Sequence, residues 1–278
     1  ERQYKKPMKW FSIPQLFRYE RQQKGRLREH FQLNADIIGE AEIGADAELI
    51  ALLIDVLRAL GLGADDFVIR LSSRDAWQEF FAERATVGSD EYAFFQIIDK
   101  LERTPPEVAA KQLSALGVSI EDVQAFIEAG VPNGELEAVL DNLKARGLES
   151  FVKVDYGIIR GLAYYTGVVF EAFDKQGEFR AIAGGGRYDK LIHLISDGKT
   201  DLPALGFGMG DVVLMELLRS KGLVPEGASG ADVYCLIEDE THRPMALKLI
   251  QTLRELGVRV DYSLVPLKPN KQFKQASG

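Results

Sequence analysis

Cysteine and histidine are nearly missing from this chain of 278 residues. The single cysteine, Cys235, excludes a disulfide framework within the chain and a cysteine zinc cluster. The three histidines, His30, His193 and His242, are too widely spaced to indicate a histidine metal site. Charge-free apolar runs near the ~20 residues that a membrane helix needs are also missing, so we expect no membrane partner. No signal-peptide pattern is visible, and the expected location is therefore cytoplasmic.

Apolar material for a buried core is plentiful. Hydrophobic residues make up 46% of the sequence and include 15 Phe and 9 Tyr, which excludes a disordered chain. At ~100–200 residues per domain, the length predicts one large domain or two smaller ones.

The formal net charge of −8 is unevenly distributed. Residues 1–28 hold nine Lys/Arg and two Glu, a net +7, whereas residues 29–150 hold nine basic and 24 acidic residues, a net −15. Residues 151–278 are balanced, with sixteen of each sign. The basic opening is either a solvated face or a site for an anionic ligand such as a phosphate, and composition alone does not decide between them.

Hydrophobic patterns predict a chain that mixes strands and helices. Apolar and alternating runs predict strands at 8–18, 30–38, 67–71, 151–158, 166–174, 179–184, 203–210, 232–237 and 258–262. A period of 3.6 residues predicts helices at 46–60, 75–85, 212–221 and 242–256. We expect the first two strands to pair as an antiparallel hairpin. The acidic stretch 90–149 has helical periodicity and indicates a small helical insertion.

The segment 17–36, FRYERQQKGRLREHFQLNAD, places charged and amide side chains on common strand faces. Period-2 alternation puts Arg18 and Glu20 on one face of the first strand, and Gln32 and Asp36 on one face of the next. Burying a guanidinium, two carboxylates and an amide is costly without a ligand or partners. The segment is therefore either a ligand site or a solvated hairpin face with cross-strand ion pairs.

Three further segments combine glycine with arginine, tyrosine or apolar residues. They are RGLAYYTG at 160–167, GGGRYD at 184–189 and LGFGMG at 205–210. The first could be a tight turn flanked by core tyrosines. Glycines in the second either let another group approach the backbone or form a bulge. In the third, alternate glycines leave one strand face bare, which either admits a flat ring or allows tight helix–sheet packing.

In this order, the four segments resemble the signatures of the class II aminoacyl-tRNA synthetases and, among them, of histidyl-tRNA synthetases. Segment 17–36 resembles class II motif 2, and segments 160–167 and 184–189 resemble the two histidine-binding signatures. Segment 203–210 resembles the start of motif 3. The resemblance implies an α+β fold, in which a class II antiparallel sheet is flanked by helices, with a helical insertion and a partial C-terminal α/β domain.

The resemblance also implies how the chain is divided. Residues 1–89, with motif 2, and 150–223, with the histidine signatures and motif 3, would form the catalytic core. Residues 90–149 would be the helical insertion, 224–230 a linker and 231–278 an incomplete anticodon-binding domain. Motif 1 and the end of the anticodon-binding domain are not found, so we expect a fragment of a longer protein.

Two arginines are implied as catalytic residues. By resemblance, Arg18 and Arg160 contact the α-phosphate of ATP from two sides and also bind the substrate histidine. Attack by the histidine carboxylate concentrates negative charge at that phosphate, which a fixed guanidinium stabilises. The resemblance further implies ATP contacts by Glu20 near the adenine, by Arg26 on the outer phosphates and by Phe31.

Five residues are implied in binding the rest of the amino acid. Gln32 and Asp36 match the residues that hold the α-ammonium, since a carboxylate paired with an amide suits a bound cation. Tyr164, Tyr165 and Tyr188 match positions that line the imidazole pocket. A site that hydrogen-bonds the ring rejects analogues that leave its buried partners unpaired, often by ~10⁴-fold or more. The expected amino acid is L-histidine.

The chain departs from the common family pattern at three positions. Ala163 stands where most relatives carry Asp, and Val213 stands where motif 3 ends in an arginine against the ATP. His30 stands at the place of the adenine-stacking phenylalanine, with Phe31 beside it. The first two departures indicate a subgroup and not an inactive enzyme, but they leave open what replaces the motif 3 charge.

The leading hypothesis is an ATP-dependent histidine–tRNA ligase, which makes histidyl-adenylate and then transfers the histidyl group to the 3′ end of tRNA(His). Mg²⁺ is expected with ATP, and a homodimer is expected from the resemblance. The alternatives are a histidine-sensing regulatory subunit of ATP phosphoribosyltransferase and a non-catalytic synthetase-like domain of a kinase. Retention of Arg18 and Arg160 favours the ligase, because the regulator needs no α-phosphate clamp.

Overall fold

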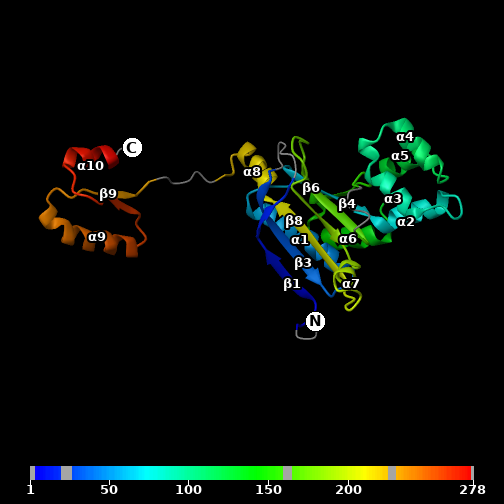
Figure 1. Cartoon of the computed structure of the whole chain (residues 1–278), viewed down its shortest axis with the longest axis horizontal. Helices are drawn as coiled ribbons and strands as arrows, with labels where there is room; N and C mark the ends of the chain where they lie inside the picture. Colours follow the sequence, from blue (N-terminus) through cyan, green and yellow to red (C-terminus); the bar gives the residue numbers. More distant parts are fainter. Residues whose placement is uncertain (1–3, 20–26, 159–164, 225–229, 277–278) are drawn as a thin grey trace. The chain divides into compact units, whose positions relative to one another are not determined.

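The computed structural model divides the chain into two compact units, residues 1–224 and 225–278 (Figure 1). It describes residues 4–19, 27–158, 165–224 and 230–276. Among these residues, none of the helices combines the length and the apolar character that crossing a membrane requires.

A mostly antiparallel sheet forms the centre of the first unit. Within the described residues it has eight strands, in the spatial order β1-β3-β8-β7-β6-β4-β5, and β2 pairs with β3 beside that path. The β4–β5 pair is parallel and the other pairs are antiparallel. This sheet, flanked by helices, confirms the expected α+β class. The strands are β1 (Met8–Ser12), β2 (Gln15–Phe17), β3 (Glu29–Ile38), β4 (Phe67–Ser73), β5 (Val152–Val154), β6 (Val168–Asp174), β7 (Ala183–Arg187) and β8 (Ala204–Gly210).

One predicted strand, 8–18, is divided in two. β1 ends at Ser12 and β2 begins at Gln15, because Pro14 lacks the backbone N–H that a continuous ladder needs. Both parts still pair with β3, as the predicted hairpin requires. Between them, the backbone N–H of Gln32 donates to the carbonyl of Pro14 at 3.2 Å.

The strand predicted at 179–184 lies later in the chain, at 183–187. The reason is a turn after β6. The buried carboxylate of Asp174 accepts hydrogen bonds from the backbone N–H groups of Glu178 (2.9 Å) and Phe179 (3.0 Å). These bonds hold the residues in a turn, so the strand pairing begins only after it.

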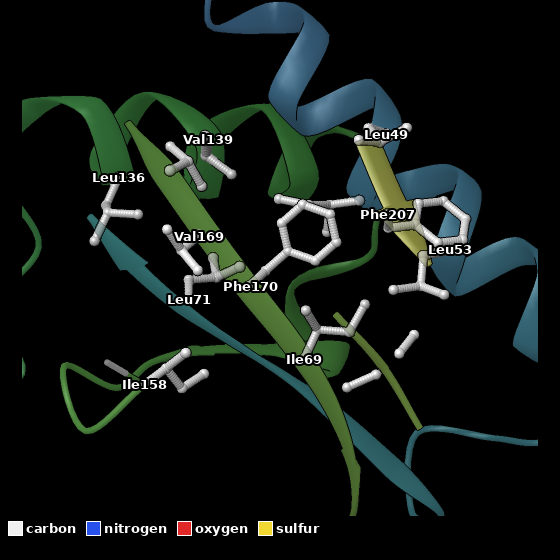
Figure 2. Packing of buried hydrophobic residues seen from close by; sticks show 14 of the residues in the cluster. Leu49, Leu53, Ile69, Leu71, Leu136, Val139, Ile158, Val169, Phe170 and Phe207 are labelled. Carbon is white, nitrogen blue, oxygen red and sulfur yellow. The ribbon is translucent and has the colours of Figure 1, made fainter. Parts of the chain in front are cut away.

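Helices cover the apolar face of the sheet. Leu49 and Leu53 of α1 and Leu136 and Val139 of α6 belong to one buried cluster with Phe207 of β8 (Figure 2). The helices of this unit are α1 (Gly44–Ala59), α2 (Arg74–Arg84), α3 (Glu91–Asp99), α4 (Pro106–Ser114), α5 (Ile120–Ala129), α6 (Gly134–Ala145), α7 (Leu191–Ile195) and α8 (Asp211–Ser220), with short 3-10 turns η1 (Leu101–Arg103) and η2 (Glu149–Phe151).

The acidic stretch 90–149 contains helices α3 to α6. The side chains of Asp90, Ser119 and Asn133 cap α3, α5 and α6 by accepting backbone N–H groups of the first turn. The indole of Trp77 in α2 packs against the ring of Phe126 in α5, with centroids 4.8 Å apart. Buried residues of α3 to α6 belong to the same hydrophobic cluster as the sheet, so these helices share its core.

In the described part of the second unit, residues 230–276, two short parallel strands pair and two helices accompany them. The side chain of Gln272 is buried and bonds the backbone of Ile237 twice, accepting its N–H at 3.0 Å and donating to its carbonyl at 2.8 Å. These bonds anchor α10, for which the hydrophobic pattern of the sequence predicted no helix. The elements are β9 (Val233–Cys235), η3 (Glu240–His242), α9 (Arg243–Glu255), β10 (Val260–Tyr262) and α10 (Pro269–Ala276).

Candidate active site

The face of the sheet opposite the apolar core carries polar side chains of β3. Gln32 and Asp36 alternate along this strand with the buried side chains of Ala35 and Ile37. The Nε2 of Gln32 donates to Oδ1 of Asn34 at 2.6 Å, so the amides are linked along the face. The carboxylate and amides identified in the sequence therefore share one surface.

Glycines of the next two strands form a floor beside these side chains. Asp36 pairs with Gly206 of β8, which pairs with Gly186 of β7. A Cβ at Gly206 would lie 2.1 Å from Oδ1 of Asp36, and one at Gly208 would lie 2.6 Å from Nε2 of Gln32. Because no real Cβ tolerates such distances, the alternate glycines of β8 are what allow the polar side chains to lie across the sheet.

Two of the predicted tyrosines meet at this floor. The hydroxyl of Tyr188 donates a hydrogen bond to Oδ1 of Asp36, and its backbone N–H donates to the carbonyl of Ala204 at 2.7 Å. The ring of Tyr165 lies against Gly186, where a Cβ would come within 2.9 Å of its Cδ1. The fold thus brings Asp36, Tyr165 and Tyr188 together from three separate segments.

An open pocket continues along the same face. Arg18, which follows β2, and Arg180, which precedes β7, line it together with His30 and Gln32 of β3. The other lining residues are glycine or aliphatic, and no described lining residue carries a carboxylate. Two guanidinium groups that line one pocket favour an anionic ligand.

Backbone groups fix the position of Arg18 at this pocket. Its N–H donates to the carbonyl of Arg28 at 2.9 Å, and its Nε donates to the carbonyl of Leu27 at 2.8 Å. Arg180 is a pocket residue that the sequence analysis did not single out, because it lies outside all four recognised segments. The only signal in the sequence is its place shortly before the glycine triplet.

Some predicted site residues are not placed by the structure. Those outside the described residues are Glu20, Arg26, Arg160 and Tyr164. The approach of Arg18 and Arg160 to one phosphate therefore stays a prediction. Phe31 lies on the opposite face of β3 from Gln32, with 48% of its surface exposed, whereas its neighbour His30 lines the pocket. An ATP contact by Phe31 also stays a prediction, although the alternation of the strand does not favour it.

Arg187, within the GGGRYD segment, is a buried structural residue. It is 4% exposed, and its Nε donates to both carboxylate oxygens of Asp46 at 3.2 Å. Its Nη1 also donates to the carbonyl of Glu40 at 3.0 Å. The pair ties β7 to the first turn of α1 at the residue before Tyr188.

Glu135 of α6 is a partly buried carboxyl that the sequence analysis did not single out. Its Oε2 accepts a hydrogen bond from the hydroxyl of Ser73 at 2.9 Å, and a Cβ at Gly167 would lie 3.0 Å from its Oε1. Burial raises the pKa of Glu135 to about 7, more than the Ser73 hydrogen bond lowers it. Glycine at 167, which ends the RGLAYYTG segment, therefore leaves room for this carboxyl.

A metal cage is not formed by the protein's own side chains in the part of the chain that the structure describes. No group of three or more His, Cys, Asp or Glu residues there is arranged to hold a metal ion.

The family model for histidyl-tRNA synthetase matches residues 1–211. The chain belongs to the histidyl-tRNA synthetase family. It is thus an aminoacyl-tRNA synthetase sequence, as the four recognised segments indicated.

Curated relatives agree with this family over nearly the whole chain. The histidine–tRNA ligase of Opitutus terrae is 43% identical, over 98% of this chain and 67% of that protein. The chloroplastic/mitochondrial histidine–tRNA ligase of Arabidopsis thaliana is 37% identical, over 98% of this chain and 59% of that protein. This chain therefore spans about two thirds or less of these relatives, consistent with the expected fragment.

Solved structures share the fold. A histidyl-tRNA synthetase from a Nostoc species superposes with a TM-score of 0.76 at 24% identity, covering 99% of this chain and 69% of that one. A Bacillus halodurans protein described as an ATP phosphoribosyltransferase regulatory subunit/histidyl-tRNA synthetase gives the same TM-score at 22% identity, covering 99% of this chain and 73% of that one. At these identities the likeness concerns the fold alone.

Proposed function

We propose that the protein containing this chain is a histidine–tRNA ligase. In the first step, a carboxylate oxygen of L-histidine bonds to the α-phosphorus of ATP, and the bond to the β-phosphate breaks to release pyrophosphate. In the second, a ribose hydroxyl at the 3′ end of tRNA(His) attacks the carbonyl carbon of the adenylate, and AMP leaves. The observation that carries the proposal is one sheet face with an acid and tyrosines at one end and an arginine-lined pocket beside them.

The amino-acid end of the site suits a cationic group next to a polar ring. The carboxylate of Asp36 and the amide of Gln32 would hold the α-ammonium, since both lie on the same face of β3. Tyr188 orients Asp36 through its hydroxyl, and Tyr165 lies across the glycine floor. The two phenols, with Tyr164, would line the imidazole pocket.

The phosphate end suits charge stabilisation. The guanidinium of Arg18, whose Nε donates to the carbonyl of Leu27, would face the charge that develops at the α-phosphate. A fixed donor stabilises that charge without reorganising during the reaction, and Arg160 would act with it. The adenine would lie in the same pocket, with Glu20 near it, and Arg26 would contact the outer phosphates.

Mg²⁺ would arrive with ATP. Magnesium is usually bound by substrate phosphates and waters with one or two carboxylates, and it polarises the phosphates when bound. Glu171 of β6 would supply one carboxylate, because its side chain approaches Gly184 of the glycine floor, where a Cβ would lie 3.5 Å from its Cγ. One protein carboxylate together with the phosphates of ATP and water fits a magnesium ion that binds with the nucleotide.

The test is histidine-dependent exchange of pyrophosphate into ATP by the full-length protein. The expected result is exchange that requires L-histidine and is not supported by the other amino acids. Binding of histidine together with background exchange would overturn the proposal and favour the regulatory subunit of ATP phosphoribosyltransferase. Charging of tRNA(His) then tests the second step.

A homodimer and a cytoplasmic location complete the proposal. Exposed aromatic side chains on the outer strands, Trp10 and Phe11 of β1 and Phe17 of β2, support a second copy as the partner.

A further inference from the structure

Strand register shows where the pocket lies relative to the amino-acid end. Asp36 pairs with Gly206, and Gln32 pairs with Gly210. At ~3.3 Å per residue, Gln32 is ~13 Å from Asp36 along β3. Because β7 runs antiparallel to β8, the chain upstream of β7 leads toward Gly210 and away from Asp36. Arg180 therefore lines the pocket near Gln32 and away from Asp36.

The backbone around Arg180 is fixed on both sides. Upstream, the carboxylate of Asp174 accepts the N–H groups of Glu178 and Phe179. Downstream, the N–H of Ile182 donates to the carbonyl of Ala172 at 2.7 Å. The arginine is thus carried on a short, hydrogen-bonded turn, which lowers the ordering cost of binding a ligand.

The two arginines of the pocket are carried by different parts of the sheet. Arg18 follows β2, which pairs with β3, whereas Arg180 precedes β7. β3 and β7 are separated by β8, which places them ~10 Å apart at the usual strand spacing. Guanidinium groups that reach one pocket from separate parts of the sheet, above a glycine floor, suit an extended polyanion better than one phosphate.

A buried histidine gives an independent indication of a polar ligand. His30 lines the pocket with 9% of its surface exposed, and its Nδ1 has no hydrogen-bond partner among the described residues. Buried polar atoms are nearly always paired in folded proteins, so this nitrogen is poised for a group that enters the pocket.

The residues of the first turn of α8 that line this pocket carry no positive charge. Val212 and Val213 line it with aliphatic side chains, and position 213 is where the family resemblance led us to expect an arginine. Arg180 brings a guanidinium to the same pocket from the β6–β7 turn.

We infer that Arg180 binds the β- and γ-phosphates of ATP, the two that leave as pyrophosphate. This inference deepens the proposed function and rests on it, because ATP is the polyanion that the proposed reaction uses. In this arrangement Arg18 faces the reacting phosphate, and Arg180 holds the leaving end. The positive charge missing from α8 is thus supplied by another segment.

The test measures ATP and AMP binding by calorimetry with the full-length protein and its Arg180→Ala variant. The variant is expected to bind ATP at least tenfold more weakly and AMP within twofold of the unsubstituted protein, because AMP lacks the two phosphates. The KM for ATP and for pyrophosphate in the exchange reaction should rise in parallel, with the KM for histidine unchanged. Arg180→Lys should recover part of the affinity for ATP.

Lys175→Ala is the matched control, since Lys175 is an exposed cation of the same turn that does not line the pocket. Equal ATP affinities for Arg180→Ala and Lys175→Ala, at equal thermal stability, would overturn the inference. Equal losses for ATP and AMP would also overturn it, because they would assign Arg180 to the nucleoside. Absence of exchange by the unsubstituted protein would instead defeat the proposed function, while the ATP and AMP affinities would still decide the role of Arg180.

Discussion

At Gly206, polar side chains of the site lie directly against the backbone of β8. The missing side chain of Gly206 leaves the space that the Asp36 carboxylate and the Tyr188 hydroxyl occupy, at 2.1 and 2.7 Å from the position of a Cβ. Both groups belong to the proposed amino-acid end of the site. A methyl group there would displace the carboxylate without altering any charge.

Gly206→Ala is therefore expected to raise the KM for histidine at least tenfold and to change the KM for ATP much less, as measured by pyrophosphate exchange. Gly44→Ala is the control, because a Cβ at Gly44 meets nothing within 4 Å. If the substitution at Gly206 weakened ATP and histidine binding equally, the ammonium site would lie elsewhere.

Most elements could be predicted from the sequence, because strands and helices of this length carry a regular hydrophobic period. The predictions failed where tertiary contacts decide where a strand or helix begins and ends. The strand break at Pro14 and the delayed start of β7 depend on local turns, and α10 depends on the buried amide of Gln272. Of the site, the polar face of β3 was predictable from alternation. Arg180 was not, since its role depends on a pocket that joins distant segments.

Contact between α6 and β4 is expected to make stability depend on pH. Burial raises the pKa of Glu135 from its ordinary value of 4.5 to about 7, so the folded state prefers the protonated carboxyl that lies beside Ser73. The stabilisation is fully present below pH 4.5 and is lost as the pH rises through about 7. Glu135→Gln should therefore match the unsubstituted protein near pH 4. At pH 8.5 it should be more stable, by about 2 kcal/mol.

Urea unfolding as a function of pH measures this difference. Glu137→Gln, an exposed position on the same helix, should change little at either pH. A Glu135→Gln variant that stayed no more stable than the unsubstituted protein at pH 8.5 would show that the carboxyl is not buried as described.

At the scale of the whole molecule, the outer strands β1 and β2 expose large aromatic side chains. Trp10 is 61% exposed, and Phe11 and Phe17 are each 73% exposed. A soluble monomer rarely leaves such a group of apolar side chains in water, which is why a second copy is the proposed partner.

Phe11→Ser should raise the dissociation constant of the full-length dimer at least tenfold, because it removes apolar area from the proposed interface. Sedimentation at micromolar concentrations measures the constant, and Tyr92→Ser, at another exposed aromatic residue (62%) in α3, serves as the comparison. Indistinguishable constants for the two variants would place the subunit contact on another surface.

The buried Arg187–Asp46 pair connects strand β7 of the sheet to helix α1. Arg187 immediately precedes the tyrosine that orients Asp36, and its partner begins the helix packed on the underside. A substitution that displaces α1, even far from the substrates, would thus also displace the side chain of Tyr188. Substitutions in the hydrophobic core beneath the sheet would then reduce discrimination among amino acids before they reduce the amount of folded protein.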